Sequence, residues 1–142
     1  MTYEEMRLTL EHARASALKI KALTWRIDET SLIGQRLTAV YGSERVKGGD
    51  AHSDPVYRAV MDIINSEQRL KDQMTEAVMR VEKGKKLVSF MRDEKQRTVL
   101  TDFYLYGLSY GTMRKVYGLT ANSSVYRIIQ KARDDLYKQL QK

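Results

Sequence analysis

Hydrophobic residues recur at alternating steps of three and four along most of the chain, which predicts an all-α fold. From about Thr2 to Tyr41 the stripe consists of Tyr3, Met6, Leu10, Ala13, Ala17, Ile20 and Ile27. From about Pro55 to Met91 it consists of Val60, Ile63, Leu70, Met74, Ala77, Val81, Val88 and Met91, with Glu67 and Gly84 as the exceptions. The pattern therefore predicts two long N-terminal amphipathic helices.

Neither helix can bury an apolar stripe alone, so the two are expected to fold back as a hairpin or to pair with a second chain as a coiled coil. We favour a hairpin that also dimerises, with Trp25 as an anchor between the helices. Pro55 suits the first turn of the second helix, and Gly84 is expected to break this helix or to act as a hinge. The segment from Gly42 to Asp54 has the composition of a flexible connector.

The residue pattern in the last third of the chain predicts two helices that are joined by a tight turn. Ser109 suits a helix N-cap and Gly118 suits the residue after a helix end, where a left-handed conformation is needed. A second helix should follow, with Val125, Ile128, Ile129, Ala132 and Leu136 on one face. That face is expected to pack on Val99, Leu100, Phe103, Tyr104, Met113 and either Val116 or Tyr117. Two helices with a glycine-containing turn are typical of a helix-turn-helix unit.

The opposite face of this helix is polar and cationic, which suits base edges and phosphates in a major groove. We expect Tyr126, Arg127 and Gln130 to approach bases, and the cations Arg114, Lys115, Lys131 and Arg133 to neutralise phosphates. The full predicted DNA-binding set is Arg114, Lys115, Asn122, Ser123, Ser124, Tyr126, Arg127, Gln130, Lys131 and Arg133. A solvated basic helix in a bundle is the alternative.

Charge favours the nucleic-acid interpretation. Residues 92–142 hold ten Lys or Arg and five Asp or Glu, a net of +5, whereas residues 1–91 have fifteen and thirteen, a net of +2. Between Phe103 and Arg133 there are five basic residues and no acidic one. A basic surface on a small domain is the electrostatic footprint of a nucleic-acid binder.

The stretch from Lys95 to Leu140 resembles region four of bacterial sigma factors and its phage-encoded relatives. The matching elements are Arg97-Thr98-Val99-Leu100, Tyr104, Gly107-Leu108-Ser109-Tyr110, Gly118-Leu119-Thr120, Val125-Tyr126-Arg127, Lys131-Ala132-Arg133 and Leu136. The whole chain is similar to small phage or prophage regulators of late or autolysin genes. The resemblance implies a transcriptional regulator in the cytoplasm of a bacterial host.

Two positions depart from the family pattern. Arg114 stands where a small residue usually allows close packing, so the crossing angle should differ or Gly111 should supply the close approach. One extra residue in Thr120-Ala121-Asn122-Ser123 leaves the start of the second helix open by a residue or two.

Composition gives little support to other chemistry. The chain has no cysteine, and its two histidines, His12 and His52, lie far apart without metal-ligand spacing. We therefore expect no enzyme activity, no metal and no cofactor. No segment approaches the roughly 20 apolar residues of a membrane span, and the N-terminus lacks the pattern of a secretion signal.

The sequence thus predicts an oligomerisation region over 1–91 and a helix-turn-helix DNA-binding domain over 92–142. The expected partners are double-stranded DNA and a second copy of the chain, with RNA polymerase as a further candidate. The expected function is sequence-specific DNA binding by a phage-type transcriptional regulator. A small terminase-like packaging subunit and a coiled-coil module docking on RNA polymerase remain the alternatives.

Overall fold

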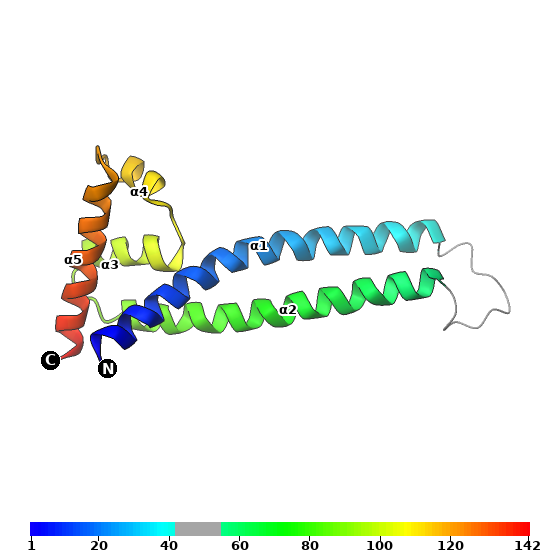
Figure 1. Ribbon diagram of the computed structural model, residues 1–142, viewed down its shortest axis with the longest axis horizontal. Helices are drawn as coiled ribbons and strands as arrows, with labels where there is room; N and C mark the ends of the chain where they lie inside the picture. The colour runs from blue at the N-terminus through cyan, green and yellow to red at the C-terminus, as the bar shows by residue number, and fades with distance from the viewer. Residues whose placement is uncertain (42–54) are drawn as a thin grey trace. The chain divides into compact units, whose positions relative to one another are not determined.

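The computed structural model describes residues 1–41 and 55–142, with side chains for 1–36 and 55–142. Every regular element in these ranges is helical, as the sequence predicts (Figure 1). The elements are α1 (Tyr3–Tyr41), α2 (Pro55–Val88), α3 (Glu94–Leu100), the π-helical turn η1 (Thr101–Leu105), α4 (Tyr110–Val116) and α5 (Asn122–Leu140).

The two long N-terminal helices are confirmed, with bounds close to those predicted. α1 begins one residue later than expected, and α2 begins at Pro55 but ends at Val88, three residues early. After Val88, turn hydrogen bonds from Phe90 N to Leu87 O and from Met91 N to Val88 O, at 3.1 and 3.0 Å, tighten the chain and end the helix. The predicted connector from Gly42 to Asp54, including His52, lies outside the described residues.

The chain divides into two compact units that do not follow the predicted boundary at residue 91. Unit 1 comprises Met1–Ile20 and Glu76–Lys142, and unit 2 comprises Lys21–Thr75. Each long helix therefore contributes one part to each unit. The predicted division at 91/92 would cut through unit 1.

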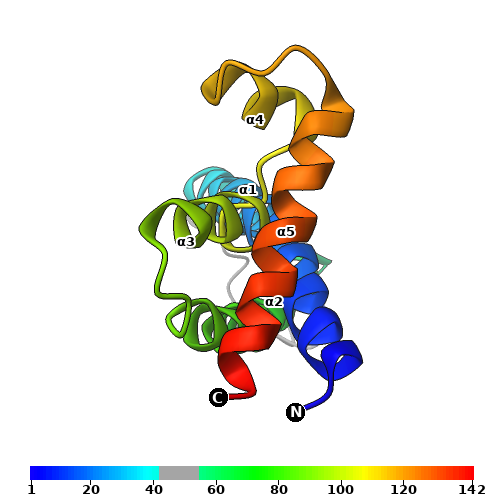
Figure 2. The ribbon, with the colours of Figure 1, turned by 90° about the vertical axis from the view of Figure 1, so that its left-hand side faces the viewer.

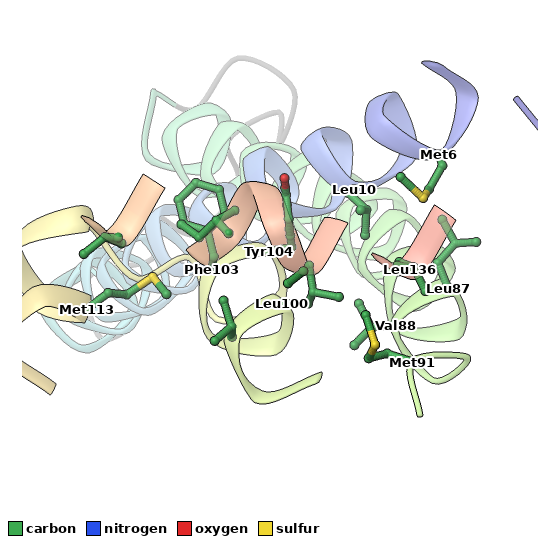
Figure 3. Packing of buried hydrophobic residues seen from close by; sticks show 14 residues of the cluster. Met6, Leu10, Leu87, Val88, Met91, Leu100, Phe103, Tyr104, Met113 and Leu136 are labelled. Atoms are coloured by element: carbon green, nitrogen blue, oxygen red, sulfur yellow. The ribbon is translucent and has the colours of Figure 1, made fainter. Parts of the chain in front are cut away.

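Unit 1 has one hydrophobic core, to which α1 and α2 contribute together with the C-terminal helices (Figure 3). Met6 and Leu10 of α1 are fully buried in the same cluster as Leu87, Met91 and Leu136. α3 and α4 have only seven residues each. Together with α5 they are too small to enclose a hydrophobic core without further helices. The N-terminal part of α1 covers the side that these helices leave open.

Gly84 neither breaks α2 nor ends it, so that prediction is wrong. The residue is buried inside the helix, where α1 crosses α2 within unit 1. A Cβ atom at Gly84 would lie 2.4 Å from the Cβ of Ala13. Glycine is therefore needed here because it lets two helix backbones approach closely.

In unit 2 the second half of α1 and the first half of α2 run antiparallel (Figure 1). The Ser31 hydroxyl donates to Oε1 of Glu67 at 3.1 Å, and Gly34 faces the side chain of Ile63. Trp25 is 66% exposed. The prediction that it anchors the hairpin is therefore wrong.

Candidate nucleic-acid interface

α4 begins and ends at the residues that the sequence predicts. The Ser109 side chain caps the helix by accepting from the backbone N–H of Thr112 at 3.1 Å. Gly118 has a φ of 66°, and the N–H of Leu119 donates to the Arg114 carbonyl at 2.8 Å. This six-to-one hydrogen bond is that of a Schellman ending, which turns the chain sharply after the helix.

The segment that precedes α4 also ends at a glycine with a positive φ, although its closing hydrogen bond spans one residue more. Asp93 caps α3 by accepting from the N–H of Gln96, and the helix continues into η1. Gly107, with a φ of 67°, follows, and the N–H of Leu108 donates to the Asp102 carbonyl at 3.0 Å. The carboxylate of Asp102 also accepts from the hydroxyl of Tyr117, which fixes the residues after α4 against η1.

α5 begins at Asn122, with Ala121 in the N-cap position and no side-chain cap. This places the start of the second helix, which the sequence left open. The predicted inner face is confirmed, because Val125, Ile129, Ala132 and Leu136 are buried and Ile128 is half-buried. Against it pack α3 and α4, the latter at the N-terminal end of α5 (Figure 2). Tyr117, and not the 64% exposed Val116, completes this contact.

The outer face of α5 carries most of the predicted DNA-binding residues. Its exposed members are Asn122, Ser123, Tyr126, Arg127, Gln130 and Lys131, while Ser124 is half-buried. Lys115 of α4 is exposed and Arg114 is half-buried. The face therefore presents hydrogen-bonding groups and two cations along about three helical turns, from residue 122 to residue 131.

Arg133, a member of the predicted DNA-binding set, is half-buried and makes hydrogen bonds within unit 1. Its Nε donates to the hydroxyl of Tyr3 at 2.9 Å, and its Nη1 to the hydroxyl of Tyr104 at 3.3 Å. The Tyr3 hydroxyl in turn donates to Asp134 at 2.8 Å. Burial alone lowers the pKa of Arg133, but the two hydroxyls raise it above its ordinary value, so the side chain stays charged. Arg133 is therefore not one of the exposed residues of the outer face of α5, although two hydrogen bonds leave part of its guanidinium unused.

The structure shows how the chain packs around Gly111 and Arg114, where the sequence departs from the sigma-factor pattern. Gly111 does not supply a close helix approach, because a Cβ atom there would have only the Ser109 hydroxyl at 4.0 Å. Met113, which precedes Arg114, is fully buried and makes the contact of α4 with the core. Arg114 lies at the edge of this contact.

The N-terminal helix contributes a cationic side chain to this region that is not among the residues predicted from the sequence. Arg14 of α1 donates from Nη1 to the backbone carbonyls of Phe103 and Leu108, at 2.6 and 3.0 Å. Its guanidinium also lies over the Phe103 ring, 3.9 Å from the centroid. No local signal in the sequence links residue 14 to residues 103–108, since the contact depends on how the chain folds back.

Two findings on the described residues concern metal ligands and membrane spans. Residues 1–41 and 55–142 contain no cluster of three or more potential metal ligands. Within the same ranges, no helix has the length and apolar character required to span a membrane. Comparison with family models, curated proteins and solved structures finds no match for this chain.

Proposed function

We propose that the chain binds double-stranded DNA in a sequence-specific manner, with α4 and α5 as a helix-turn-helix, and acts as a phage-type transcriptional regulator. The observation that carries this proposal is the division of α5 into two faces. Val125, Ile129 and Leu136 are buried on one side, while Tyr126 and Arg127 are exposed on the other. An α-helix with such a free polar face fits a major groove.

Charge along the same segment supports the proposal. No acidic residue occurs between Phe103 and Arg133, and Lys115, Arg127 and Lys131 are exposed there. None of these three cations has an ion-pair partner among the described residues. They are therefore free to neutralise phosphates, which releases condensed counterions and favours binding at low salt.

Arg127 and Lys131 are assigned different roles. Arg127 lies in the second turn of α5, where side chains of a recognition helix contact base edges, and arginine pairs well with guanine. Lys131 lies one turn further on and is suited to a phosphate. Loss of a good base contact costs about 1–3 kcal/mol of discrimination, whereas loss of a phosphate contact weakens all DNA alike.

The test uses the full-length chain, because unit 1 needs both ends of the sequence. A bound duplex is selected from a random pool, and its affinity is compared with that of random duplex by fluorescence anisotropy over a range of salt. Arg127→Ala should lower the specific affinity selectively, and Lys131→Ala should lower both affinities. Lys85→Ala removes one exposed charge from α2 and serves as the control, with little expected effect.

Absence of binding at low salt would refute the proposal. Equal effects of all three substitutions would reduce it to unspecific attraction of a basic protein. A discrete footprint near a promoter points to regulation, whereas a ring of many subunits in native mass spectrometry points to the packaging alternative. Binding to RNA polymerase without DNA would support the docking alternative.

Self-association belongs to the same proposal, because one helix-turn-helix covers one half-site and a dimer reads two. Unit 2 exposes large apolar side chains, among them Trp25 and Leu32 of α1 and Ile64 of α2, each at least half exposed. Sedimentation of the full chain tests this part. A monomer that binds its site at full affinity would contradict it.

A further inference from the structure

Unit 1 contains a cleft of about 460 Å³ beside the proposed DNA-binding face. Its walls come from the N-terminal part of α1, from η1, from the first residue of α4 and from α5. The volume lies within the range of about 300–1,000 Å³ that is common for small-ligand sites. Gln130 and Tyr126 of α5 line it and are exposed, so the cleft opens next to the candidate interface.

The cleft is positively charged. Arg7, Arg14, Arg133 and Glu11 are its charged lining residues, a net of +2. Glu11 is engaged by Arg7, whose Nη1 donates to Oε1 of Glu11 at 2.6 Å. The remaining two guanidiniums, of Arg14 and Arg133, have no carboxylate within ion-pair distance in the described part of the chain.

These two cations are half-buried, which makes their lack of a counter-charge significant. Burial lowers the pKa of Arg14, yet an arginine keeps its charge at neutral pH. The hydrogen bonds of Arg14 come from Nη1 and go to two carbonyls, and those of Arg133 go to two hydroxyls. A guanidinium has five N–H donors, so each retains donors for a ligand. A half-buried charge without a counter-charge has lost part of its hydration, and an anion in the cleft would compensate both guanidiniums.

Aromatic rings form the other part of the lining. Tyr110 and Tyr126 are 38% and 50% exposed, so their rings are accessible at the cleft. Phe103 also lines the cleft, with its ring centroid 5.4 Å from that of Tyr110. Exposed tyrosine rings provide stacking surfaces for planar heterocycles, and nucleobases use such surfaces without strict sequence preference.

We propose that this cleft binds a nucleotide, with its phosphate at Arg14 and Arg133 and its base against the more exposed of the two tyrosine rings, that of Tyr126. Phosphate is one of the anions that guanidinium groups bind through paired N–H donors, and the neighbouring aromatic rings favour an anion that carries a planar base. The nucleotide can be free in solution or can belong to a nucleic-acid strand, since both offer the same groups. The site does not depend on duplex binding by α5, because a free mononucleotide is sufficient to fill it.

The experiment is isothermal titration of the full-length protein with adenosine monophosphate, adenosine and inorganic phosphate, without DNA. The monophosphate should bind saturably, at least tenfold more tightly than either part alone. In the Tyr126→Leu variant, the affinity for the monophosphate should fall close to that for inorganic phosphate, because only the stacking surface for the base is lost. Arg14→Gln should weaken the binding of the monophosphate and of inorganic phosphate. Lys138→Ala removes an exposed charge outside the cleft and should leave both affinities unchanged.

Arg14 also binds two backbone carbonyls, so its substitution can disturb the fold. A matched pair at exposed Gln130 avoids this difficulty. Gln130→Glu brings a negative charge to the cleft and should weaken the monophosphate at least about threefold, whereas Gln130→Lys should strengthen it by a similar factor. Circular dichroism should show the same helix content for both variants.

Three results would overturn the proposal: no saturable binding of the monophosphate, inorganic phosphate binding equally well, or unchanged affinity in the Gln130 pair. Competition with a short single-stranded oligonucleotide identifies the source. Displacement of the monophosphate by the oligonucleotide assigns the cleft to a nucleic-acid strand, and failure to displace assigns it to a free nucleotide. Because no DNA duplex enters these measurements, failure of this site and failure of duplex binding are separate outcomes.

Discussion

The contact of Gly84 with Ala13 predicts that an alanine at position 84 destabilises the protein, against the usual effect of this substitution in helices. The new Cβ would lie 2.4 Å from that of Ala13, which is itself fully buried in α1. Optimal carbon contacts lie at about 3.5–4.0 Å. The two helices would therefore have to separate by about 1 Å, because neither methyl group can rotate away.

The magnitude follows from two opposing effects. Replacing glycine by alanine inside a helix stabilises it by about 0.8–1 kcal/mol. Overpacking of a core costs about 1–3 kcal/mol, and a rigid clash between two backbones belongs at the upper end. We therefore expect Gly84→Ala to lower the free energy of unfolding by about 2 kcal/mol. Gly111→Ala is the control, since its Cβ would meet only the Ser109 hydroxyl at 4.0 Å, and it should stabilise by up to about 1 kcal/mol.

The assay is urea unfolding of the full chain, followed by circular dichroism at two protein concentrations. Ala13→Gly is then combined with Gly84→Ala, which moves the methyl group from one helix to the other. The double variant should recover about 2–3 kcal/mol relative to the sum of the single effects, as expected for residues in direct contact. If Gly84→Ala is as stable as the unmodified chain, or if the two substitutions are additive, the close helix crossing is wrong.

Further predictions concern the turns, the core and the response to alkaline pH. Gly118→Ala should cost about 1–2 kcal/mol of stability from its left-handed backbone alone, and Gly107→Ala more, because a leucine side chain also lies 2.9 Å from the new Cβ. Leu10→Ala should cost about 2–5 kcal/mol and should accelerate hydrogen exchange in α5, since Leu10 is fully buried in the shared core. Burial and the hydrogen bond to Asp102 raise the pKa of Tyr117 above its ordinary value of 10.0, so the unfolded chain releases this proton first. Stability should therefore be full below pH 10 and should fall as the pH rises above it, and Tyr117→Phe should make this fall shallower in pH-dependent urea unfolding.

Local features of the fold could be predicted from the sequence because their causes are local. Ser109 caps α4 through an amide three residues away, and Gly118 ends it through its own backbone conformation. The inner face of α5 follows from helical periodicity, since Val125 and Leu136 fall on one stripe. The outer face follows from the same periodicity. These predictions need no knowledge of which other segment lies nearby.

Contacts between distant segments could not be predicted in this way. Gly84 interrupts an apolar stripe, and by itself this observation does not distinguish a helix break from a close helix crossing. Its meaning depends on Ala13 in another helix. In the same way, Arg133 belongs to a basic segment, but Tyr3 and Tyr104 accept its hydrogen bonds. A basic side chain at the edge of a polar face can serve either solvent or the interior.

The boundary between the two units likewise depends on contacts between distant segments. The apolar stripe of α1 continues past Ala17, so the sequence assigns the whole helix to one oligomerisation region. Yet Met6 and Leu10 are buried with Leu136, whereas Lys21 and the following residues belong to unit 2. An apolar stripe indicates that each turn of a helix is covered by another segment, but it does not indicate which segment covers it. The first turns of α1 therefore pack against the buried face of α5. Their removal should disturb the candidate DNA-binding face, although no residue of that face is changed.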